Sequence, residues 1–438
     1  VRTGCTTCRG RKVKCDETKP FCERCSSTGR ACEGYKEPAP LKRRVRRSKY
    51  SISPVSNLSF DFVGDIDEHR SFHYFRHQAV DNISGYFELP FWDYLALQAS
   101  CSEPCVRYAL LALSSLHEFY GITSLESQFS ATEKAKLLKR LALKQYIKAI
   151  GLLTDNLSTK QPPLQVILIS CLIFIWIEFL QDNLDTALGH LKSGLQLLNE
   201  LQNSPHPRCV DEPVARLFTR LHTQVTVHGN SSFDHNSSNA ILLSMVPNGL
   251  PIAFRDMFEA RYSLDSELAI IFRFHRQTEN PTFIQYRLTH HPFPDPLSLE
   301  AICQSHLNNL QKWQTAFQRM KAASSEDRDE KQSIALAQLE IQYLLVANTL
   351  QTLFTSQMIY DNFHADFERM LSLAERLVLT TKEKFYIFAF DTGALAPLFY
   401  LVLKCPNLEL RRKAIDLLKQ APSREGMWKR ESVLEVAE

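Results

Sequence analysis

Residues 5–32 read CTTCRGRKVKCDETKPFCERCSSTGRAC and contain six cysteines, Cys5, Cys8, Cys15, Cys22, Cys25 and Cys32. The spacing C-x2-C-x6-C occurs twice, once from Cys5 to Cys15 and once from Cys22 to Cys32. Two tetrahedral zinc ions need eight ligand positions, and six thiolates fill them when two sulfurs each bridge both metals. The repeat therefore predicts a two-Zn²⁺ cluster in which each half supplies two terminal ligands and one bridging ligand.

The alternative of three disulfides would suit a small secreted domain. We expect no secretory leader before these cysteines, and the chain has 438 residues, far more than such a domain. So short a segment also has almost no apolar core, with Val13 and Phe21 as its main apolar residues. Its folding free energy must come from metal, which supplies about 10–16 kcal/mol per structural zinc ion.

Positive charge is concentrated between two of the cysteines. Four cations lie between Cys8 and Cys15, whereas the equivalent interval of the second half contains only Arg30. These predicted DNA-binding residues are Arg9, Arg11, Lys12 and Lys14. On a short helix held by metal, they can contact phosphates or donate to the O6 and N7 acceptors of guanine in the major groove.

The same polarity extends over a longer range. Residues 1–50 contain fifteen Lys and Arg against five Asp and Glu, a net charge of +10, and the remainder of the chain is −7. Six thiolates and two Zn²⁺ ions lower the first value to about +8. A second basic run is predicted to serve nuclear import or phosphate contact, with simple solubilisation as the alternative; it comprises Lys42, Arg43, Arg44, Arg46 and Arg47.

Composition divides the chain into three parts. We predict a zinc-cluster DNA-binding domain at 1–35, a flexible basic linker rich in Ser and Pro at 36–59, and a large helical domain at 60–438. Apolar periodicity predicts an all-α fold of stacked helix pairs, without a convincing run of alternating strands. Helical pattern is expected at 133–153, 164–180, 184–198, 251–277, 299–322, 330–359, 361–383 and 391–404.

Three of these segments carry more specific expectations. Residues 133–153 place Leu137, Leu141, Ile147 and Ile150 on one side of a helix. The leucines of 184–198 follow a heptad for only about two repeats, which favours core packing over a coiled coil. The apolar run 166–177 is too short for a bilayer and favours a core helix, so no membrane partner is expected.

The remaining cysteines fall in or beside apolar stretches and are expected to be reduced, buried thiols. They are Cys101, Cys105, Cys171, Cys209, Cys303 and Cys405.

Two other classes of function compete with DNA binding. An enzyme tethered to chromatin would need a catalytic group, and the candidates are His73 with His77, four residues apart, and His290-His291. The sequence HYFRH lacks the carboxylate of a metalloprotease helix, and no P-loop, nucleophile elbow or dinucleotide motif is found, so no enzyme is expected. An interaction protein that binds RNA or a protein partner would need interleaved aromatic residues, and the cluster offers only Phe21 and Tyr35.

The segment RTGCTTCRGRKVKCDETKPFCERCSSTGRACEGY, residues 2–35, resembles the fungal binuclear zinc-cluster (Zn2Cys6) transcription factors. The resemblance implies that Cys5 and Cys22 are the bridging ligands and that the other four cysteines are terminal. It also implies that Lys12 is the main base-contacting residue, reading a CGG-like triplet with Arg11 beside it. Pro20 is expected to be cis in the turn between the halves.

The rest of the chain resembles, more loosely, the helical regulatory domain of fungal-specific transcription factors. The segments RSFHYFRHQAVDNISGYF, FWDYLALQASCSEPCVRYALLALSSLHE and DTALGHLKSGLQLL carry this likeness. It implies a zinc-dependent, sequence-specific regulator of RNA polymerase II transcription in the fungal nucleus. Its partners would be double-stranded DNA and co-regulators or transcription machinery. Homodimerisation is left open because Phe62, Ile66, Phe72 and Phe75 keep no heptad after the linker.

Overall fold

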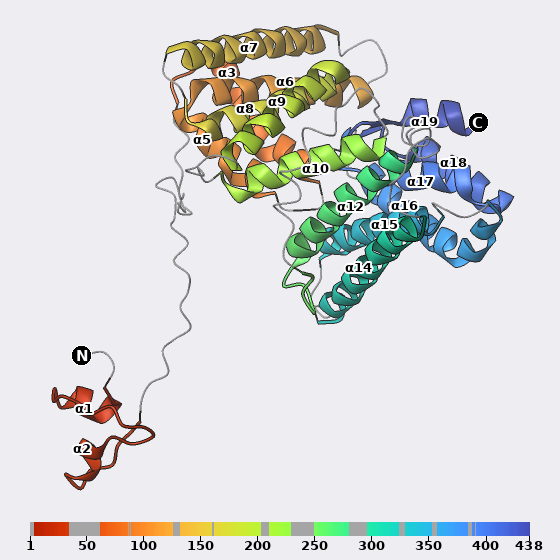
Figure 1. Ribbon diagram of the computed structural model, residues 1–438. Helices are drawn as coiled ribbons and strands as arrows, with labels where there is room; N and C mark the ends of the chain where they lie inside the picture. Colours follow the sequence, from red (N-terminus) through yellow and green to blue (C-terminus); the bar gives the residue numbers. More distant parts are fainter. Residues whose placement is uncertain are drawn as a thin grey trace, which may run out of the picture. The chain divides into compact units, whose positions relative to one another are not determined.

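The computed structural model divides into two units, Val1–Ser59 and Phe60–Glu438, which are described separately (Figure 1). The structure describes residues 4–34, 62–85, 87, 89–125, 132–159, 162–202, 210–228, 249–279, 296–323, 329–352, 357–383, 388–389 and 391–438. The basic run Lys42, Arg43, Arg44, Arg46 and Arg47 lies outside these residues, as do Cys209 and His290-His291.

The first unit has two short helices, α1 (Thr6–Gly10) and α2 (Glu23–Ser26). Each helix begins directly after a cysteine, Cys5 for α1 and Cys22 for α2, which occupies the N-cap position. The interior of the unit consists of cysteine side chains, with Val13 packed against them. This confirms that apolar burial is too small to organise the segment.

The second unit is almost entirely helical. Its first half contains α3 (Ile66–Tyr74), the π-helical turn η1 (Phe75–Ala79), α4 (Val80–Ser84), the π-helical turn η2 (Phe91–Leu95), α5 (Ala96–Ser102), α6 (Pro104–Leu125), α7 (Thr132–Thr159), α8 (Leu164–Leu180), α9 (Leu184–Gln202) and α10 (Glu212–His228). Its second half contains α12 (Met257–Glu279), α14 (Pro296–Ala323), α15 (Glu330–Thr352), the 3-10 turn η3 (Gln357–Phe363), α16 (His364–Glu383), α17 (Leu395–Lys404), α18 (Leu408–Gln420) and α19 (Arg430–Ala437).

Three two-residue strands form a small sheet that the sequence did not predict. They are β1 (Phe388–Ala389), β2 (Arg424–Glu425) and β3 (Trp428–Lys429). The sheet order is β1-β2-β3, with β1 parallel to β2 and β2 antiparallel to β3. Strands of two residues cannot show the alternation of apolar and polar residues by which strands are recognised.

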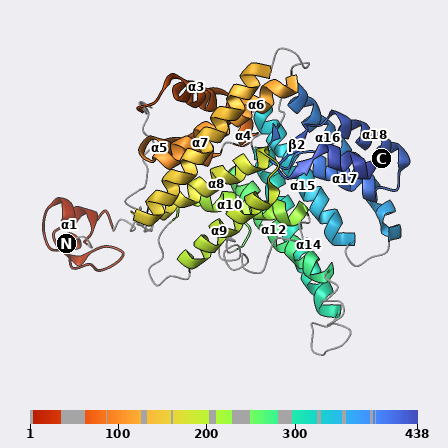
Figure 2. The same cartoon turned by 90° about the horizontal axis from the view of Figure 1, so that it is seen from above.

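Helices that follow one another in the chain pack together as pairs, which confirms the all-α prediction. The pairs include α6 with α7, α8 with α9, α15 with α16, and α17 with α18. Helices α16 to α18 gather near the C terminus, as both Figure 1 and Figure 2 show. In the described part of the chain, no helix is both long and apolar enough to cross a membrane.

Helix α8 is the centre of the first half. From Leu168 to Leu180 every residue of α8 is buried, because α6, α9 and α10 surround it. The single carboxylate in this run, Glu178, accepts hydrogen bonds from Tyr146 Oη over 2.5 Å and from Asn183 Nδ2 over 2.7 Å. Both carboxylate oxygens therefore have a hydrogen-bond partner, which a buried polar group requires.

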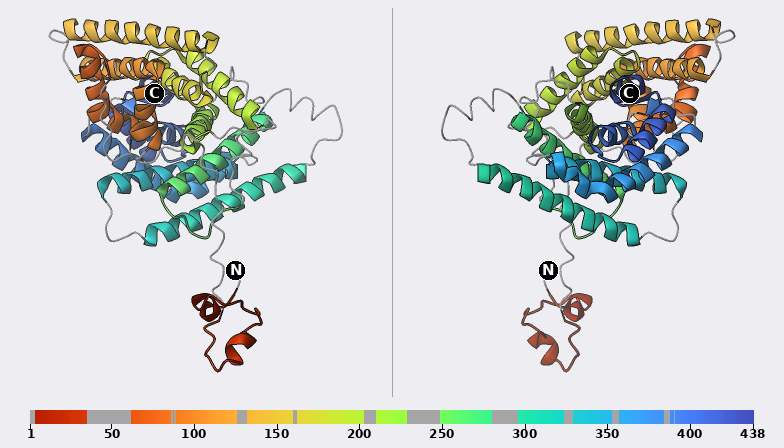
Figure 3. Two further views of the ribbon diagram at one scale, coloured as in Figure 1. Left: turned by 90° about the vertical axis from the view of Figure 1, so that its left-hand side faces the viewer. Right: turned by 90° about the vertical axis from the view of Figure 1, so that its right-hand side faces the viewer.

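The aliphatic residues that the sequence places on one side of α7 do not face the core. Ile147 is 61% exposed, and Leu137 and Ile150 are about 40% exposed. The buried side instead carries small residues and a few larger ones, namely Ala135, Leu138, Ala142, Tyr146, Ala149 and Leu153. Alanines at intervals of seven let α7 approach α6 closely, so the side with the larger aliphatic residues faces outward. Figures 1 and 3 show α7 at the margin of the helical unit.

The expectation for α9 is confirmed. Its leucines Leu188, Leu191, Leu195 and Leu198 are all buried, so the short heptad packs into the core of its own chain.

A buried carboxylate also organises the last helices. Glu425 of β2 accepts hydrogen bonds from the amides of Gly393, Ala394 and Leu395 over 2.8–3.0 Å, and so caps the N-terminus of α17. A Cβ atom at Gly393 would lie 2.6 Å from Glu425 Oε1, so glycine is required for this close approach.

Candidate metal centre and nucleic-acid interface

The two halves of the first unit repeat each other in structure as well as in spacing. The Cys5 amide donates to Cys15 Sγ over 3.4 Å, and the equivalent Cys22 amide donates to Cys32 Sγ over 3.5 Å. The amide of Val13 donates to the Cys8 carbonyl over 3.1 Å, as that of Arg30 does to the Cys25 carbonyl over 3.0 Å. The two halves therefore have the same local fold, which we call a knuckle. In each knuckle a short helix begins after the first cysteine, and the chain then turns back so that the sulfur of the third cysteine contacts the amide of the first.

The repeat places a lysine where the second half has a glycine. Lys12 has φ +57°, in the left-handed region, and its equivalent Gly29 has φ +64°. This conformation costs a residue with a Cβ atom roughly 1–2 kcal/mol, and it costs glycine nothing comparable. The first half thus holds a lysine in a backbone conformation that favours glycine, at the end of the turn that follows α1.

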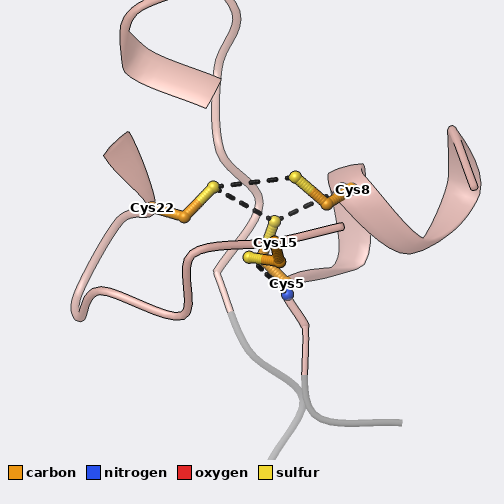
Figure 4. A group of neighbouring side chains, drawn as sticks. All are labelled: Cys5, Cys8, Cys15 and Cys22. Atoms are coloured by element: carbon orange, nitrogen blue, oxygen red, sulfur yellow. Dashed lines mark hydrogen bonds between the residues drawn. The ribbon is translucent and has the colours of Figure 1, made fainter. Parts of the chain in front are cut away.

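The sulfur atoms fall into two groups of four that could each hold a metal ion. One group is Cys5, Cys8, Cys15 and Cys22, the other is Cys5, Cys22, Cys25 and Cys32, and within each group the sulfurs lie within 4.8 Å of one another. Figure 4 shows the four side chains of the first group converging. Cys5 and Cys22 are common to both groups, and their sulfurs are 3.6 Å apart.

These distances suit zinc. Four sulfurs at about 2.3 Å from a tetrahedral zinc ion are about 3.8 Å from one another. The Sγ of Cys22 is 3.8 Å from that of Cys8 and 4.0 Å from that of Cys32. When bound, zinc supplies the positive charge and the crosslinks that a cluster of thiolates needs to stay folded.

Burial of the sulfurs makes that charge necessary. Cys5, Cys8, Cys22 and Cys25 are fully buried, while Cys15 and Cys32 are half-buried. Burial raises the pKa of Cys8, Cys22 and Cys25 to about 12. Without a cation these groups are neutral thiols at pH 7, so metal binding at this site must release protons.

Asp16 is a structural residue that the sequence reading missed. Its carboxylate accepts hydrogen bonds from the amides of Glu23 and Arg24 over 2.8 and 3.0 Å and also contacts the Thr18 hydroxyl. These contacts hold the pKa of Asp16 well below its usual range, with the Thr18 hydroxyl as the main cause. Asp16 therefore ties the loop between the halves to the N-terminus of α2. Its position directly after a cysteine gave no signal, because the contact spans seven residues.

The four predicted DNA-binding residues are all exposed. Arg9, Lys12 and Lys14 line one hollow of about 480 Å³ together with Gly4, Val13, Cys15 and Glu17. Arg11 is exposed but does not line it. Within residues 4–34, none of the four cations forms an ion pair, so their charge is available to an anionic partner. Of the cluster cysteines, only Cys15 lines the hollow, and a Cβ atom at Gly4 would lie 2.9 Å from Cys15 Cβ.

The peptide bond between Lys19 and Pro20 is cis, as expected for the turn between the halves. The His73 and His77 rings do lie together, with centroids 4.3 Å apart. In the described residues, however, the groups able to hold a metal consist of cysteines alone. Among the other cysteines, Cys105, Cys171, Cys303 and Cys405 are buried free thiols, but Cys101 is exposed, contrary to the expectation.

Two family models match the chain. The Fungal Zn(2)-Cys(6) binuclear cluster domain matches residues 3–42, and the Fungal specific transcription factor domain matches residues 70–347, more than half of the chain. The chain therefore belongs to the fungal transcription factors that combine these two domains, a class of DNA-binding transcription regulators. The cluster domain of this family binds two zinc ions.

Relatives with curated names are fungal regulators as well. The chain is 30% identical over 222 residues to the aspercryptin biosynthesis cluster-specific transcription regulator atnN of Emericella nidulans, covering 46% of this chain and 35% of the relative. It is 30% identical over 208 residues to transcription regulator lscL of Purpureocillium lilacinum, covering 45% of this chain and 49% of the relative. The transcriptional regulatory protein moc3 of Schizosaccharomyces pombe is 63% identical over 54 residues, 12% of this chain and 10% of the relative.

In each case the match spans less than half of the relative's length. No solved structure is significantly similar to the chain.

Proposed function

We propose that this chain is a zinc-dependent, sequence-specific transcription factor that regulates transcription by RNA polymerase II and reads CGG-type triplets in the major groove. The observation that carries the proposal is the hollow lined by Arg9, Lys12 and Lys14 together with Cys15 of the sulfur cluster. Because Cys8 and Cys15 flank these cations and belong to one sulfur group, the backbone that carries the cations is held in one conformation. Fixed donors can distinguish bases, whereas a flexible basic tail binds phosphates without preference.

For the metal, we propose that Cys5 and Cys22 bridge two zinc ions, with Cys8, Cys15, Cys25 and Cys32 as terminal ligands. The membership of Cys5 and Cys22 in both sulfur groups supports this assignment. The 3.6 Å distance between the Cys5 and Cys22 sulfurs supports it as well, because two bridging sulfurs are ligands of the same two ions and so lie close together.

For DNA, we propose that Lys12 donates to guanine O6 and N7, with Arg11 beside it, while Arg9 and Lys14 contact phosphates. The left-handed backbone at Lys12 places its side chain at the point where the chain leaves the turn after α1, next to Arg9 and Lys14 in the hollow. A single base contact of this kind contributes about 1–3 kcal/mol of discrimination.

The remaining parts of the chain take supporting roles in this proposal. Residues 1–35 bind DNA, and the linker 36–59 carries the basic run for nuclear import or additional phosphate contact. The helical domain 60–438 contacts co-regulators or the transcription machinery and catalyses no reaction. The fungal regulators among the relatives support a nuclear location, and a homodimer is an additional state to be tested.

The test uses the full zinc-loaded chain and two fluorescent duplexes, one with a CGG triplet and one with the triplet scrambled. We expect tighter binding to the CGG duplex and loss of the difference after zinc is removed with a chelator. Lys12→Ala should remove the preference, whereas Arg30→Ala, which removes an exposed cation of the second half, should leave it in place. Equal binding to both duplexes before and after chelation would end the proposal.

An interaction protein that binds single-stranded RNA is the second candidate. Phe21 is 59% exposed beside the cluster and could stack on a base. Within residues 4–34 it is the one aromatic residue, whereas such surfaces use several, so duplex DNA is the better fit. Competition of single-stranded RNA against the CGG duplex decides between the two: displacement by RNA at equal concentration would favour this second function.

A further inference from the structure

Helix α7 exposes a line of aliphatic side chains on the side turned away from the core. Leu143, Ile147, Ile150 and Leu157 are 55%, 61%, 40% and 48% exposed. Their spacing of four, three and seven residues puts them on one side of a helix, with Thr154 in the gap. These four residues are called the α7 stripe below. At 1.5 Å per residue the stripe is about 21 Å long.

The continuity of the stripe distinguishes it from other exposed apolar residues. Elsewhere in the described residues such side chains occur singly or in pairs, as Ile252 does alone and Val63 does with Ile66, and not in a row of four. Scattered exposed aliphatic residues are normal, but a contiguous row costs free energy in water and is typical of a binding surface. The stripe also does not help α7 to fold onto α6, because α7 uses its other side for that contact.

Basic residues surround one end of the α7 stripe. They are Lys136, Lys139, Arg140 and Lys144, all exposed. Lys136 pairs with Glu133 over 3.0 Å. Within the described residues, Arg140 and Lys144 form no ion pair, so they are free to attract a partner. The acidic residues of α7 are Glu133 and Asp155, and only Asp155 is at the opposite end.

We propose that the α7 stripe is the docking surface for an acidic amphipathic helix of a partner protein, with apolar residues every three or four positions and Asp or Glu beside them. Such a helix would cover the aliphatic row and pair with Arg140 and Lys144. The proposal gives a place and a chemistry to the co-regulator contact proposed above, and it rests on that part of the proposed function.

Charge disfavours the other occupants. If α7 of a second copy of the chain packed parallel to this helix, the two basic ends would lie together and repel each other. If it packed antiparallel, Asp155 would be the one acidic residue near the four basic side chains. Nucleic acid would pair with the lysines but would leave Leu143, Ile147 and Ile150 against phosphates and water. An acidic amphipathic helix satisfies both halves of the surface.

The experiment measures binding of the full zinc-loaded chain to a fluorescein-labelled helical peptide of about 18 residues, with Leu on one side and Glu beside it. No DNA is present, so failure of DNA recognition does not affect the result. We expect saturable binding that weakens with salt. The double variant Leu143→Ser/Ile147→Ser should lose at least about tenfold in affinity. Lys144→Glu should also bind more weakly and flatten the salt dependence.

The matched control is Leu408→Ser, because Leu408 is 63% exposed on α18, away from the stripe, and should bind the peptide normally. Since all substituted side chains are exposed, helical circular dichroism, zinc content and duplex binding should stay unchanged in every variant.

Four results would overturn the proposal. The first is that the parent chain does not bind the peptide, and the second is that the double variant binds it as tightly as the parent does. The third is that the parent binds equally well a peptide in which Ser replaces Leu and Glu is kept. The fourth is that the parent chain sediments as a dimer and the double variant as a monomer. The third result would indicate a general polyanion surface, and the fourth a contact between two copies of this chain.

Discussion

Replacing Lys12 by glycine separates the side chain from the backbone at the proposed base-reading position. Lys12 has φ +57°, a conformation that costs a residue with a Cβ atom roughly 1–2 kcal/mol in the folded state. Glycine removes this strain, but its greater freedom in the unfolded chain costs roughly 0.5–1 kcal/mol on folding. The folded cluster should therefore be as stable with Lys12→Gly as in the parent chain, or slightly more stable, as Gly29 in the second half suggests. Loss of the ammonium group should cost about 1–3 kcal/mol of binding to the correct duplex, or about 5- to 150-fold.

The assay is fluorescence anisotropy with the CGG and scrambled duplexes at one fixed salt concentration, with zinc content measured on the same samples. Lys12→Gly and Lys12→Ala should lose affinity for the CGG duplex equally while both retain two zinc ions. Resistance to a competing chelator should be at least as high for Lys12→Gly as for Lys12→Ala. If Lys12→Gly kept the preference for CGG, the lysine side chain would not be the reader, and the reasoning would be refuted.

Three further changes test other parts of the structure. Cys5→Ala removes a sulfur from both metal groups and should lower the zinc content, measured by atomic emission, well below two ions per chain. The control Cys101→Ala removes an exposed thiol and should leave the zinc content unchanged. Two zinc ions in the Cys5 variant would contradict bridging. Tyr146→Phe removes the donor to the buried Glu178 and should cost about 1.5–3 kcal/mol of stability in urea unfolding followed by circular dichroism; an unchanged midpoint would contradict this role. Burial lowers the pKa of His117 from 6.5 to about 4, so as the pH falls the unfolded chain takes up a proton at this histidine before the folded chain does. The free energy of unfolding should therefore fall by about 1 kcal/mol between pH 6.5 and pH 5.5. The variant His117→Gln should not show this loss. Parallel pH profiles of parent and variant would count against that account.

The zinc site was predictable because its ligands lie close together in the chain. The two C-x2-C-x6-C repeats restrict where six sulfurs can meet, and the structure places them in two groups of four that share Cys5 and Cys22. Helix α8 was predictable for a similar reason, since an uninterrupted apolar run can be stable only when it is surrounded by other helices. Both conclusions follow from local composition and spacing, without knowledge of the packing partners.

Contacts between distant residues were not predictable in this way. The cap from Glu425 to the Leu395 amide joins residues that are 30 apart in the chain. The contacts of Asp16 with the amides of α2 span only seven and eight residues, but they join the two halves of the zinc unit, which the cysteine cluster brings together. The small sheet of β1, β2 and β3 has the same origin, because its first two strands are more than thirty residues apart.

Helix α7 marks the boundary between the two kinds of information. Its sequence alone established that it is a helix and that aliphatic residues recur along it. Which side is buried was decided by α6, which accepts the narrow row of Ala135, Ala142 and Ala149 and leaves Ile147 in water. Periodicity gives more weight to large side chains, but close packing of two helices favours small ones, so only the tertiary structure could show which side faces outward.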